Sequence, residues 1–482
     1  MTSRPLSLAC AAALALVACG GTGTATSPSA PDAATAPPAR PAAASAATNF
    51  DWPTFGLNPE RTSATSRATG ITAANAHRLR RRVVALPGTV DSTPIYLHGV
   101  AVRGRRHDVF VMTTTYGRTL AVDAARGRIL WTFTPRGYGS WAGTYRITNA
   151  SPTADSDRRH VFAASPDGRI HRLSLANGRE TSGWPVTITR LPAREKITSS
   201  LSLDGGRVIA MTGGYIGDAP PYQGHVVAFD RVSGRITGIV NSLCADRRGL
   251  LVPSSCASSD SAIWARAGAA VGPGGDLYVA TGNAPFDGRS DFGDSVLRIT
   301  SDVRRIVGHW TPANQRVLNE TDSDLGSTGP IWLGGPYLFQ SGKDARIHLL
   351  RNLHQVQELA APGGQPMFTA PAVVRGRSGT TVFATTFSAT AAYALRGGRL
   401  RQLWSRPTAG TSPILAGGLL YVYDPGGALV VRRPGSGRRV ARLPAGPGHW
   451  NSPVIGGGRI ALPEGNANDH RTDGRLSLYV LP

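Results

Sequence analysis

The sequence predicts an all-β protein folded as an eight-bladed β-propeller, with a seven-bladed ring as the alternative. Glycine and proline are abundant, at 58 and 35 of 482 residues, which suits many short strands joined by turns. A strand–turn–strand unit recurs at intervals of roughly 40 to 70 residues, a spacing typical of propellers and related arrays. No apolar pattern of helical period extends over a useful length.

The clearest copy of the repeat is GRTLAVDAARGRILWTF, residues 117–133. One strand ends at Asp123, a turn follows with Gly127, and the next strand reaches Trp131. The Asp (Ser in another copy) caps the turn, Gly supplies a positive φ, and the aromatic residue packs between neighbouring sheets. Weaker copies are expected at residues 168–184, 224–240, 295–310, 345–359, 391–404, 427–443 and 474–481.

Closure of the ring follows from the last copy, residues 474–481, which lacks its final strand. One blade cannot bury both of its faces, so blades stack, and a ring removes the exposed ends. The segment RRRVVAL, residues 80–86, is expected to supply the missing strand and to join the N- and C-terminal parts of the chain. The irregular stretch 241–294 keeps the seven-bladed alternative open.

The N-terminal region has the layout of an export signal. Arg4 precedes a short apolar segment that ends in Leu-Val-Ala-Cys19, which resembles a bacterial lipobox. Residues 1–19 are therefore expected to be a lipoprotein signal with Cys19 as the lipidated residue, and a plain signal cleaved near Ala18 is the alternative. Residues 20–48 are rich in Ala, Pro, Ser and Thr, a composition typical of a disordered linker. The propeller is then expected over residues 49–482, tethered by lipid to the extracytoplasmic face of a bacterial envelope membrane.

Cysteine usage agrees with an oxidising compartment. Cys10 lies in the expected signal and Cys19 is the lipid acceptor, which leaves Cys244 and Cys256 in one loop-like stretch. Two such cysteines in an exported protein predict a loop disulfide, with two free thiols as the alternative.

The net charge of +22 arises from 52 basic and 30 acidic residues. Only Lys196 and Lys343 are lysines, so the other 50 basic residues are arginines, as GC-rich coding would produce. The arginines are spread along the sequence, so we expect no nucleic-acid partner. A protein or an anionic envelope component remains a possible partner, and the chain is expected to be a monomer.

The Asp-x-x-x-Gly-x-x-x-Trp unit, Asp123 to Trp131, resembles the repeat of quinoprotein alcohol dehydrogenases and their propeller relatives. The run DWPTFGLNPERTS, from residue 51, is similar to the opening segment of those enzymes, and the likeness extends almost to the end of the chain. The resemblance implies pyrroloquinoline quinone (PQQ) in the central funnel, stacked on a Trp and beside Ca²⁺. The ion would polarise a quinone carbonyl, and an Asp would remove the alcohol proton.

Four residues match that site. The resemblance places Trp264 as the stacking residue and Asn283 as a Ca²⁺ ligand. It places Asp294 near the catalytic and metal-facing Asp, and Lys343 at the basic residue that contacts the quinone. Each has a structural alternative. Trp264 could pack between blades, Asn283 could form a tight turn, Asp294 could cap a turn, and Lys343 could be solvated.

Other features depart from the family. No two cysteines are adjacent, and the segment 211–225, where the resemblance places a Ca²⁺-binding Glu, contains no Glu and only Asp218 nearby. Asp322 and Asp324, at alternate positions, could grip Ca²⁺ or form a polar loop.

Further polar residues are expected in the funnel. The polar residues between the two strands of the hairpin 276–299 should face it. Four residues of the late loops, His449, Trp450, Asn451 and His470, are expected to line it as well.

The sequence therefore supports two functions. The first is an exported, lipid-anchored, non-enzymatic binding or scaffold propeller with a degenerate quinone site. The alternative is a PQQ- and Ca²⁺-dependent dehydrogenase that oxidises an alcohol or sugar outside the membrane. The sequence alone leaves open whether the protein is an enzyme.

Overall fold

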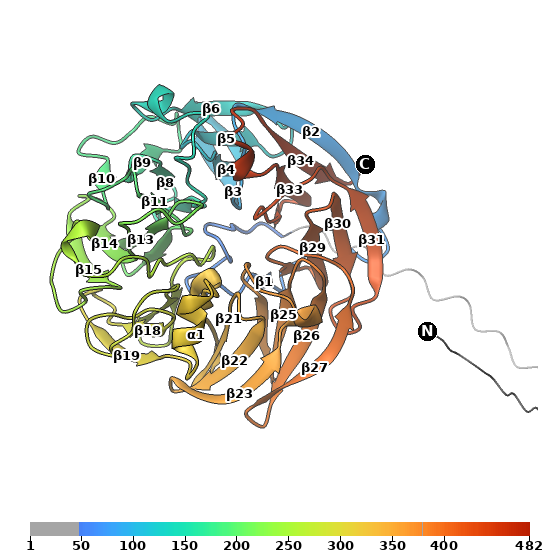
Figure 1. Cartoon of the computed structure of the whole chain (residues 1–482). Helices are drawn as coiled ribbons and strands as arrows, with labels where there is room; N and C mark the ends of the chain where they lie inside the picture. Colours follow the sequence, from blue (N-terminus) through green and yellow to red (C-terminus); the bar gives the residue numbers. More distant parts are fainter. Residues whose placement is uncertain (1–47, 378) are drawn as a thin grey trace, which may run out of the picture. The chain divides into compact units, whose positions relative to one another are not determined.

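Eight sheets, antiparallel apart from one short parallel pair, surround a common centre in the computed structural model, which describes residues 48–377 and 379–482 (Figure 1). The eight-bladed prediction is confirmed over the seven-bladed alternative. Cys19, the expected signal 1–19 and nearly all of the expected linker lie outside the described residues, so those expectations stay predictions.

The first four complete blades follow one another along the chain. They are β3 (Ile95–Val102), β4 (Arg105–Thr113), β5 (Thr119–Asp123) and β6 (Ile129–Phe133); β7 (Thr153–Ala154), β8 (His160–Ser165), β9 (Arg169–Ser174) and β10 (Val186–Thr187); β11 (Glu195–Ile197), β12 (Ser202–Asp204), β13 (Arg207–Gly214), β14 (His225–Asp230) and β15 (Ile236–Asn241); and β16 (Ala270–Val271), β17 (Leu277–Ala280), β18 (Val296–Ile299) and β19 (Ile306–Trp310).

The remaining blades include two strands from the N-terminal part of the propeller. They are β20 (Ile331–Gly334), β21 (Tyr337–Ser341), β22 (Arg346–Arg351) and β23 (His354–Ala360); β24 (Ala372–Gly376), β25 (Gly379–Thr385), β26 (Thr390–Arg396) and β27 (Arg399–Arg406); β1 (Ala64–Thr65) with β28 (Ile414–Ala416), β29 (Leu419–Asp424), β30 (Ala428–Arg432) and β31 (Arg439–Pro444); and β2 (Arg80–Leu86) with β32 (Val454–Gly456), β33 (Arg459–Glu464) and β34 (Gly474–Val480).

Helical structure is minor in the described part of the chain. It consists of α1 (Gln315–Glu320) and short 3-10 turns, and no helix there has the length and apolar character needed to cross a bilayer. The 3-10 turns are η1 (Ala76–Arg78), η2 (Tyr138–Ser140), η3 (Pro253–Ser255), η4 (Leu325–Ser327), η5 (Pro362–Gly364) and η6 (Ala467–Asp469).

The ring closes where the sequence predicts. β2 pairs antiparallel with β34 in continuous register from Arg80↔Val480 to Leu86↔Gly474, so the strand expected at residues 80–86 completes the last blade. Arg81 strengthens this seam, because its Nη2 donates to Glu464 Oε1 at 2.8 Å and its Nε donates to Ser477 Oγ at 2.6 Å.

The repeat residues act as the sequence indicates. At the clearest copy, Asp123 Oδ1 accepts hydrogen bonds from the amides of Ala125 and Arg126, and Gly127, at φ +66°, closes the turn with a bond to the Asp123 carbonyl. Burial would raise the pKa of Asp123, but these amides and His107 hold it below its usual value.

At two copies of the repeat the tryptophan links its blade to the next. Trp131 Nε1 donates to the Leu175 carbonyl at 2.8 Å, and Trp404 Nε1 donates to the Pro434 carbonyl at 2.8 Å. The turn glycine of the following blade lies under the indole, and a Cβ added at Gly437 would lie 2.6 Å from Trp404. Glycine is therefore needed there for its size as well as for its positive φ.

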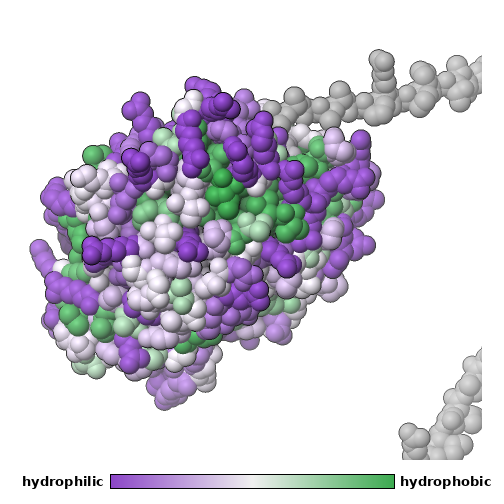
Figure 2. All heavy atoms as spheres, turned by 90° about the horizontal axis from the view of Figure 1, so that it is seen from above, coloured by the Kyte–Doolittle hydropathy of each residue, from purple (hydrophilic) through white to green (hydrophobic). Residues whose placement is uncertain are grey.

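A disulfide joins Cys244 and Cys256, as predicted, in the long connection after β15. The view of Figure 2, at right angles to Figure 1, shows mostly hydrophilic side chains with a hydrophobic strip between them. Large apolar residues are otherwise concentrated in the core between the blades.

Candidate functional site

Loops from six of the eight blades meet around a cavity of about 450 Å³. Its wall combines aromatic, basic and acidic side chains, which is the usual composition of a small-molecule site. The lining residues are Asn149, Lys196, Ile216, Gly217, Asp218, Trp264, Arg266, Asp322, Asp324, Ser327, Lys343, Phe368, His449, Trp450 and Asn468.

One side of the cavity is basic and aromatic. Lys196, on β11, places its Nζ 5.4 Å from the centroid of the Trp264 ring, and the Arg266 guanidinium lies 4.7 Å from the centroid of Trp450. Trp264 and Arg266 come from the same loop before β16, two residues apart. Two aromatic faces and two cations therefore lie together, an arrangement suited to a planar anion.

Lys196 is only 5% exposed, and its ammonium has a single weak hydrogen bond within the described part of the chain, from Nζ to Asn149 Oδ1 at 3.4 Å. Burial and the neighbouring charge of Arg266 lower the pKa of Lys196 to about 7. Because no carboxylate of the described residues pairs with it, its charge is balanced only in part. An anion bound here would favour the protonated amine.

Arg266 also lacks an internal partner. Within the described chain its buried Nη1 has no hydrogen-bond acceptor, and burial lowers its pKa to about 10. A guanidinium nitrogen that is buried without an acceptor is costly. A carboxylate in the cavity would supply the missing acceptor.

Asp91 supports this wall from behind. It is buried and accepts hydrogen bonds from His449 Nδ1 and the Trp450 amide, both at 2.8 Å, and from the Ala467 amide at 3.1 Å. Burial acts to raise its pKa, but the bond and charge of His449 and the charge of Arg266 hold the pKa below its usual value. Asp91 therefore stays ionised and fixes the loop that carries Trp450.

The opposite side of the cavity is acidic. Lys343 Nζ lies 2.5 Å from Asp324 Oδ2 and 2.9 Å from Asp322 Oδ1. Burial would lower the pKa of Lys343, but these two carboxylates raise it overall. Asp218 lines the cavity nearby, where burial and the charges of Asp324 and Asp322 raise its pKa to about 6.

The four residues carried over from the family do not all reach the cavity. Trp264 and Lys343 line it, whereas Asn283 and Asp294 lie behind Asp324. The backbone amide of Asn283 donates to Asp324 Oδ1 at 2.9 Å. Asp294 is fully buried and accepts from the Leu325 amide at 3.1 Å, and burial raises its pKa to about 8.

These positions decide how well a metal and a quinone would fit. Ca²⁺ takes six to eight oxygen ligands, but the ammonium of Lys343 already lies between Asp322 and Asp324, and Asp294 is closed off from the cavity. The basic side, with its unpaired guanidinium nitrogen and the ring of Trp264, fits the flat carboxylated body of such a cofactor. The residues thus fit a planar anion and do not fit the metal.

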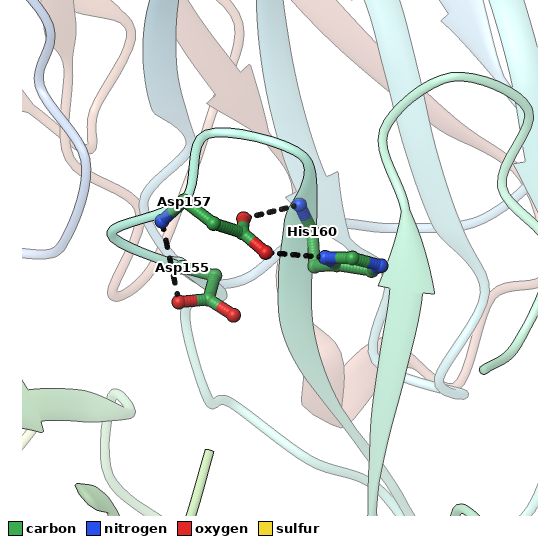
Figure 3. Close-up of side chains that lie close together, drawn as sticks. All are labelled: Asp155, Asp157 and His160. Atoms are coloured by element: carbon green, nitrogen blue, oxygen red, sulfur yellow. Dashed lines mark hydrogen bonds and ion pairs between the residues drawn. The ribbon is translucent and has the colours of Figure 1, made fainter. Parts of the chain in front are cut away.

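A second acidic cluster lies outside the cavity. Asp155, Asp157 and His160 bring their ligand atoms close together at the start of β8 (Figure 3). Arg172 Nη2, however, lies 3.0 Å from Asp155 Oδ2, 3.2 Å from Asp157 Oδ2 and 2.9 Å from His160 Nδ1. Arg231 Nη1 also lies 2.7 Å from Asp155 Oδ1, so two guanidinium groups balance the two carboxylates, and the cluster serves the packing of the blades.

The other sequence expectations have mixed outcomes. His449 and Trp450 line the cavity, but Asn451 is buried and donates to the Val90 carbonyl, and His470 lies outside the wall. In the hairpin 276–299, Asp287 is exposed and accepts from the amides of Arg289, Ser290 and Asp291, so it caps a loop away from the cavity.

The sequence analysis did not single out Lys196, Arg266, Phe368 or Asp91. A signal for Lys196 was present, because it is one of only two lysines in an arginine-rich chain. Arg266, two residues after Trp264, carried no comparable signal.

Comparison with known proteins places the fold. A family model described as outer membrane protein assembly factor BamB matches residues 63–239. The dehydrogenase subunit of the quinone-type alcohol dehydrogenase of Komagataeibacter europaeus is 29% identical over 152 residues, which cover 30% of this chain and 19% of that protein. The corresponding subunit of Gluconacetobacter polyoxogenes matches to the same extent. The chain thus aligns with only a fifth of the length of these curated relatives.

Solved structures extend the likeness over most of the ring. The quinohemoprotein alcohol dehydrogenase of Comamonas testosteroni superposes with a TM-score of 0.66 at 15% identity, over 89% of this chain and 80% of that one. A europium-containing methanol dehydrogenase gives 0.66 at 14% identity, over 89% and 98%. BamB of Moraxella catarrhalis gives 0.51 at 12% identity, over 83% and 98%. At these identities the structures establish the shared propeller fold alone.

Proposed function

We propose that this chain, a β-propeller of the quinoprotein alcohol dehydrogenase-like type, is an exported binding protein whose central cavity takes a planar, carboxylated aromatic ligand without metal-dependent chemistry. The observation that carries the proposal is a pair of cations, buried Lys196 and half-buried Arg266, set against Trp264 and Trp450. Neither cation forms an ion pair with a carboxylate of the described residues. The lipid anchor at Cys19 and the location at the envelope membrane are part of the same proposal.

Recognition would use charge and shape together. A flat ring would stack on Trp264, and its carboxylates would accept hydrogen bonds from Arg266 and from protonated Lys196. The acidic side of the cavity, at Asp322 and Asp324, would repel the ligand's carboxylates and so turn them toward Arg266 and Lys196, which fixes the orientation of the ligand. PQQ, an anionic fused-ring quinone, belongs to this ligand class.

The alternative function, a quinone-dependent dehydrogenase, is favoured by one observation. Trp264 and Lys343, both carried over from the family, line the same cavity. Against it stand the burial of Asp294 and the ion pairs of Lys343 with Asp322 and Asp324. We therefore retain the enzyme as the second candidate.

Equilibrium binding tests the first function directly. Tryptophan fluorescence of the protein is titrated with PQQ and with a naphthalene dicarboxylate, with and without Ca²⁺. We expect saturable binding that Ca²⁺ leaves unchanged. Lys196→Met and Arg266→Met should each weaken it about tenfold or more, the usual effect of losing a hydrogen bond from a charged group. Arg126→Gln, an exposed arginine on another blade, is the matched control.

The enzyme candidate has its own readout. Dye reduction is assayed with a panel of alcohols and aldoses in the presence of PQQ and Ca²⁺. Turnover that Asp294→Asn abolishes, with the fold intact, would replace the binding function with the dehydrogenase. For the anchor, Cys19→Ser should release the protein to the soluble fraction when membranes are washed at high salt, whereas the lipidated protein should stay bound.

A further inference from the structure

We infer that the outer strands of three consecutive blades form a basic rim that docks on a membrane surface rich in anionic phospholipid. The strands are β27, β31 and β2, which follow one another around the edge of the ring (Figure 1). We call this set of strands the arginine rim. The inference rests on the proposed membrane location and is independent of ligand binding in the cavity.

The distribution of arginine among the outer strands is uneven. β27 and β2 carry three arginines each and β31 carries two, with no acidic residue on any of the three strands. The outer strands of the other five blades, β6, β10, β15, β19 and β23, carry neither arginine nor lysine. The arginines of the rim are Arg80, Arg81, Arg82, Arg399, Arg401, Arg406, Arg439 and Arg442.

Most of these side chains face solvent without a counter-charge. Six of them, all but Arg81 and Arg406, are exposed, and within the described chain none of the six forms an ion pair. Codon bias explains the arginine content of the protein but not why, among the eight outer strands, only these three carry arginine. Arginines that are far apart in the sequence are therefore gathered by the fold.

The hairpin between β30 and β31 departs from the repeat at this place. In three other blades the paired residues at the bulge before the turn are apolar: Val122↔Ile129, Phe229↔Ile236 and Ile299↔Ile306. In this blade the corresponding pair is Arg432↔Arg439. Like charges directly opposite each other destabilise a sheet, so the pair is explained by a role outside folding.

The next residue of the same hairpin is also basic, where two other blades have an aspartate. The first residue of the turn is Asp123 in one blade and Asp230 in another. The backbone carbonyl of each accepts a hydrogen bond from the turn glycine, and its carboxylate accepts hydrogen bonds from backbone amides of the turn. The equivalent residue here is Arg433, whose carbonyl accepts from the Gly437 amide at 2.9 Å in the same way. An acid is thus replaced by a base beside Arg432, Arg438 and Arg439.

Arg432 itself has no acidic partner. It is 5% exposed, its Nη1 and Nη2 donate to the Gly437 carbonyl and Thr408 Oγ1, and its buried Nε has no acceptor among the described residues. Burial and the charges of Arg406 and Arg439 lower its pKa. Phosphate oxygens near this hairpin would relieve that repulsion, and the planar guanidinium suits phosphate groups.

Two observations favour a membrane over a soluble phosphate compound. The rim spans three blades and also exposes Leu403 and Val83, which are 45% and 48% exposed and could contact the interface. In addition, the described chain begins at Thr48, which bonds Ala68 beside β1, and β1 pairs with β28 in the same sheet as β31. β1 and β31 are the opposite edge strands of that sheet, so a lipid attached through the linker before Thr48 would keep this blade within reach of a bilayer, and the exposed arginines would set its orientation.

Vesicle binding of the Cys19→Ser chain tests the inference, because that variant cannot be lipidated. Co-sedimentation is measured with vesicles of phosphatidylglycerol and phosphatidylcholine and with vesicles of phosphatidylcholine alone. We expect binding to the anionic vesicles only, weakening as salt is raised. Arg432→Val with Arg439→Ile, which restores the apolar pair of three other blades, should reduce the vesicle partition about thirtyfold, as expected for two charges near the surface.

Controls separate the rim from net charge and from misfolding. Arg304→Gln with Arg305→Gln removes two exposed arginines from the turn between β18 and β19, on a blade outside the rim, and should leave binding unchanged. Arg399→Gln with Arg401→Gln is a second rim variant, on a different blade. The inference would be overturned if the control variant lost as much vesicle binding as the rim variants, or if the protein bound no vesicles. It would also be overturned by binding to neutral vesicles, or by binding to duplex DNA as tight as to anionic vesicles. Retained binding of PQQ by the rim variants keeps this test separate from the cavity.

Discussion

The ammonium nitrogen of Lys196 lies 5.4 Å from the centroid of the Trp264 ring, and Asn149 Oδ1, 3.4 Å away, is its single hydrogen-bond partner among the described residues. A buried amine without a carboxylate is held close to the point where it loses its proton. Its charge state should therefore control what the cavity accepts.

Anion binding should depend on pH through Lys196. Its pKa is lowered to about 7, so the amine is mostly charged below pH 7 and mostly neutral above it. The affinity for an aromatic carboxylate should be highest at pH 6 and fall as pH rises through 7 to 8. Isothermal titration from pH 6 to pH 9 measures this, and Lys196→Met should give a weak and nearly flat profile. A wild-type profile that stays flat would contradict the role of Lys196.

Asp294 should make the fold more stable in mild acid. Burial raises its pKa to about 8, above the ordinary value of 3.8, so the folded protein holds a proton that the unfolded chain has released. The free energy of unfolding should fall as pH rises from 4 to 8, because each unit of pKa shift corresponds to about 1.4 kcal/mol. Asp294→Asn should remove most of this decrease, as followed by urea denaturation at several pH values. Asp287→Asn is the control from the same hairpin, since backbone amides lower the pKa of Asp287.

Glycine under the repeat tryptophan should be required for stability. Gly437 has φ +65°, and a Cβ there would lie 2.6 Å from the Trp404 ring. Gly437→Ala should therefore cost about 1 kcal/mol for the backbone and roughly 1–3 kcal/mol more for the overlap. Gly183→Ala is the matched control, because Gly183 has φ +83° and open space around its Cβ position. If thermal denaturation showed the same loss of stability for Gly437→Ala and Gly183→Ala, the contact with Trp404 would be unimportant.

The seam of the ring should be sensitive to Arg81. Glu464 is 4% exposed and accepts both from Arg81 and from Ser477. Arg81→Met leaves a buried carboxylate without its cation and should cost about 3 kcal/mol. Combining it with Glu464→Gln should recover much of that loss, since the amide carries no charge. A double-mutant cycle by denaturant unfolding gives the coupling energy, and strictly additive effects would contradict the pairing.

The sequence predicted the ring well because its evidence is local. An Asp that caps a turn, a Gly with positive φ and a Trp on the next strand are read within about fifteen residues, as at residues 117–133. The closing strand at residues 80–86 was also predictable, because the last copy of the repeat ended one strand short.

The cavity was only partly predictable because it depends on distances between blades. Asp324 comes between the cavity and both Asn283 and Asp294, and nothing near those residues in the sequence reveals that shielding. Arg266 and Lys196 meet from neighbouring blades, so no motif joins them. The gathering of arginines on β27, β31 and β2 was missed for the same reason, since even spacing along the chain hid it.

The partnership of β2 with β34 also constrains how the ring assembles. The ribosome synthesises Arg80–Leu86 long before Gly474–Val480. The strand β2 therefore stays unpaired while the other seven sheets form. Until then an open edge persists at each side of the gap, and either edge could capture a strand from another molecule. Loss of the final strand should therefore impair folding yield more than the small number of missing contacts suggests, and dilution or a chaperone should help a shortened chain more than the intact one.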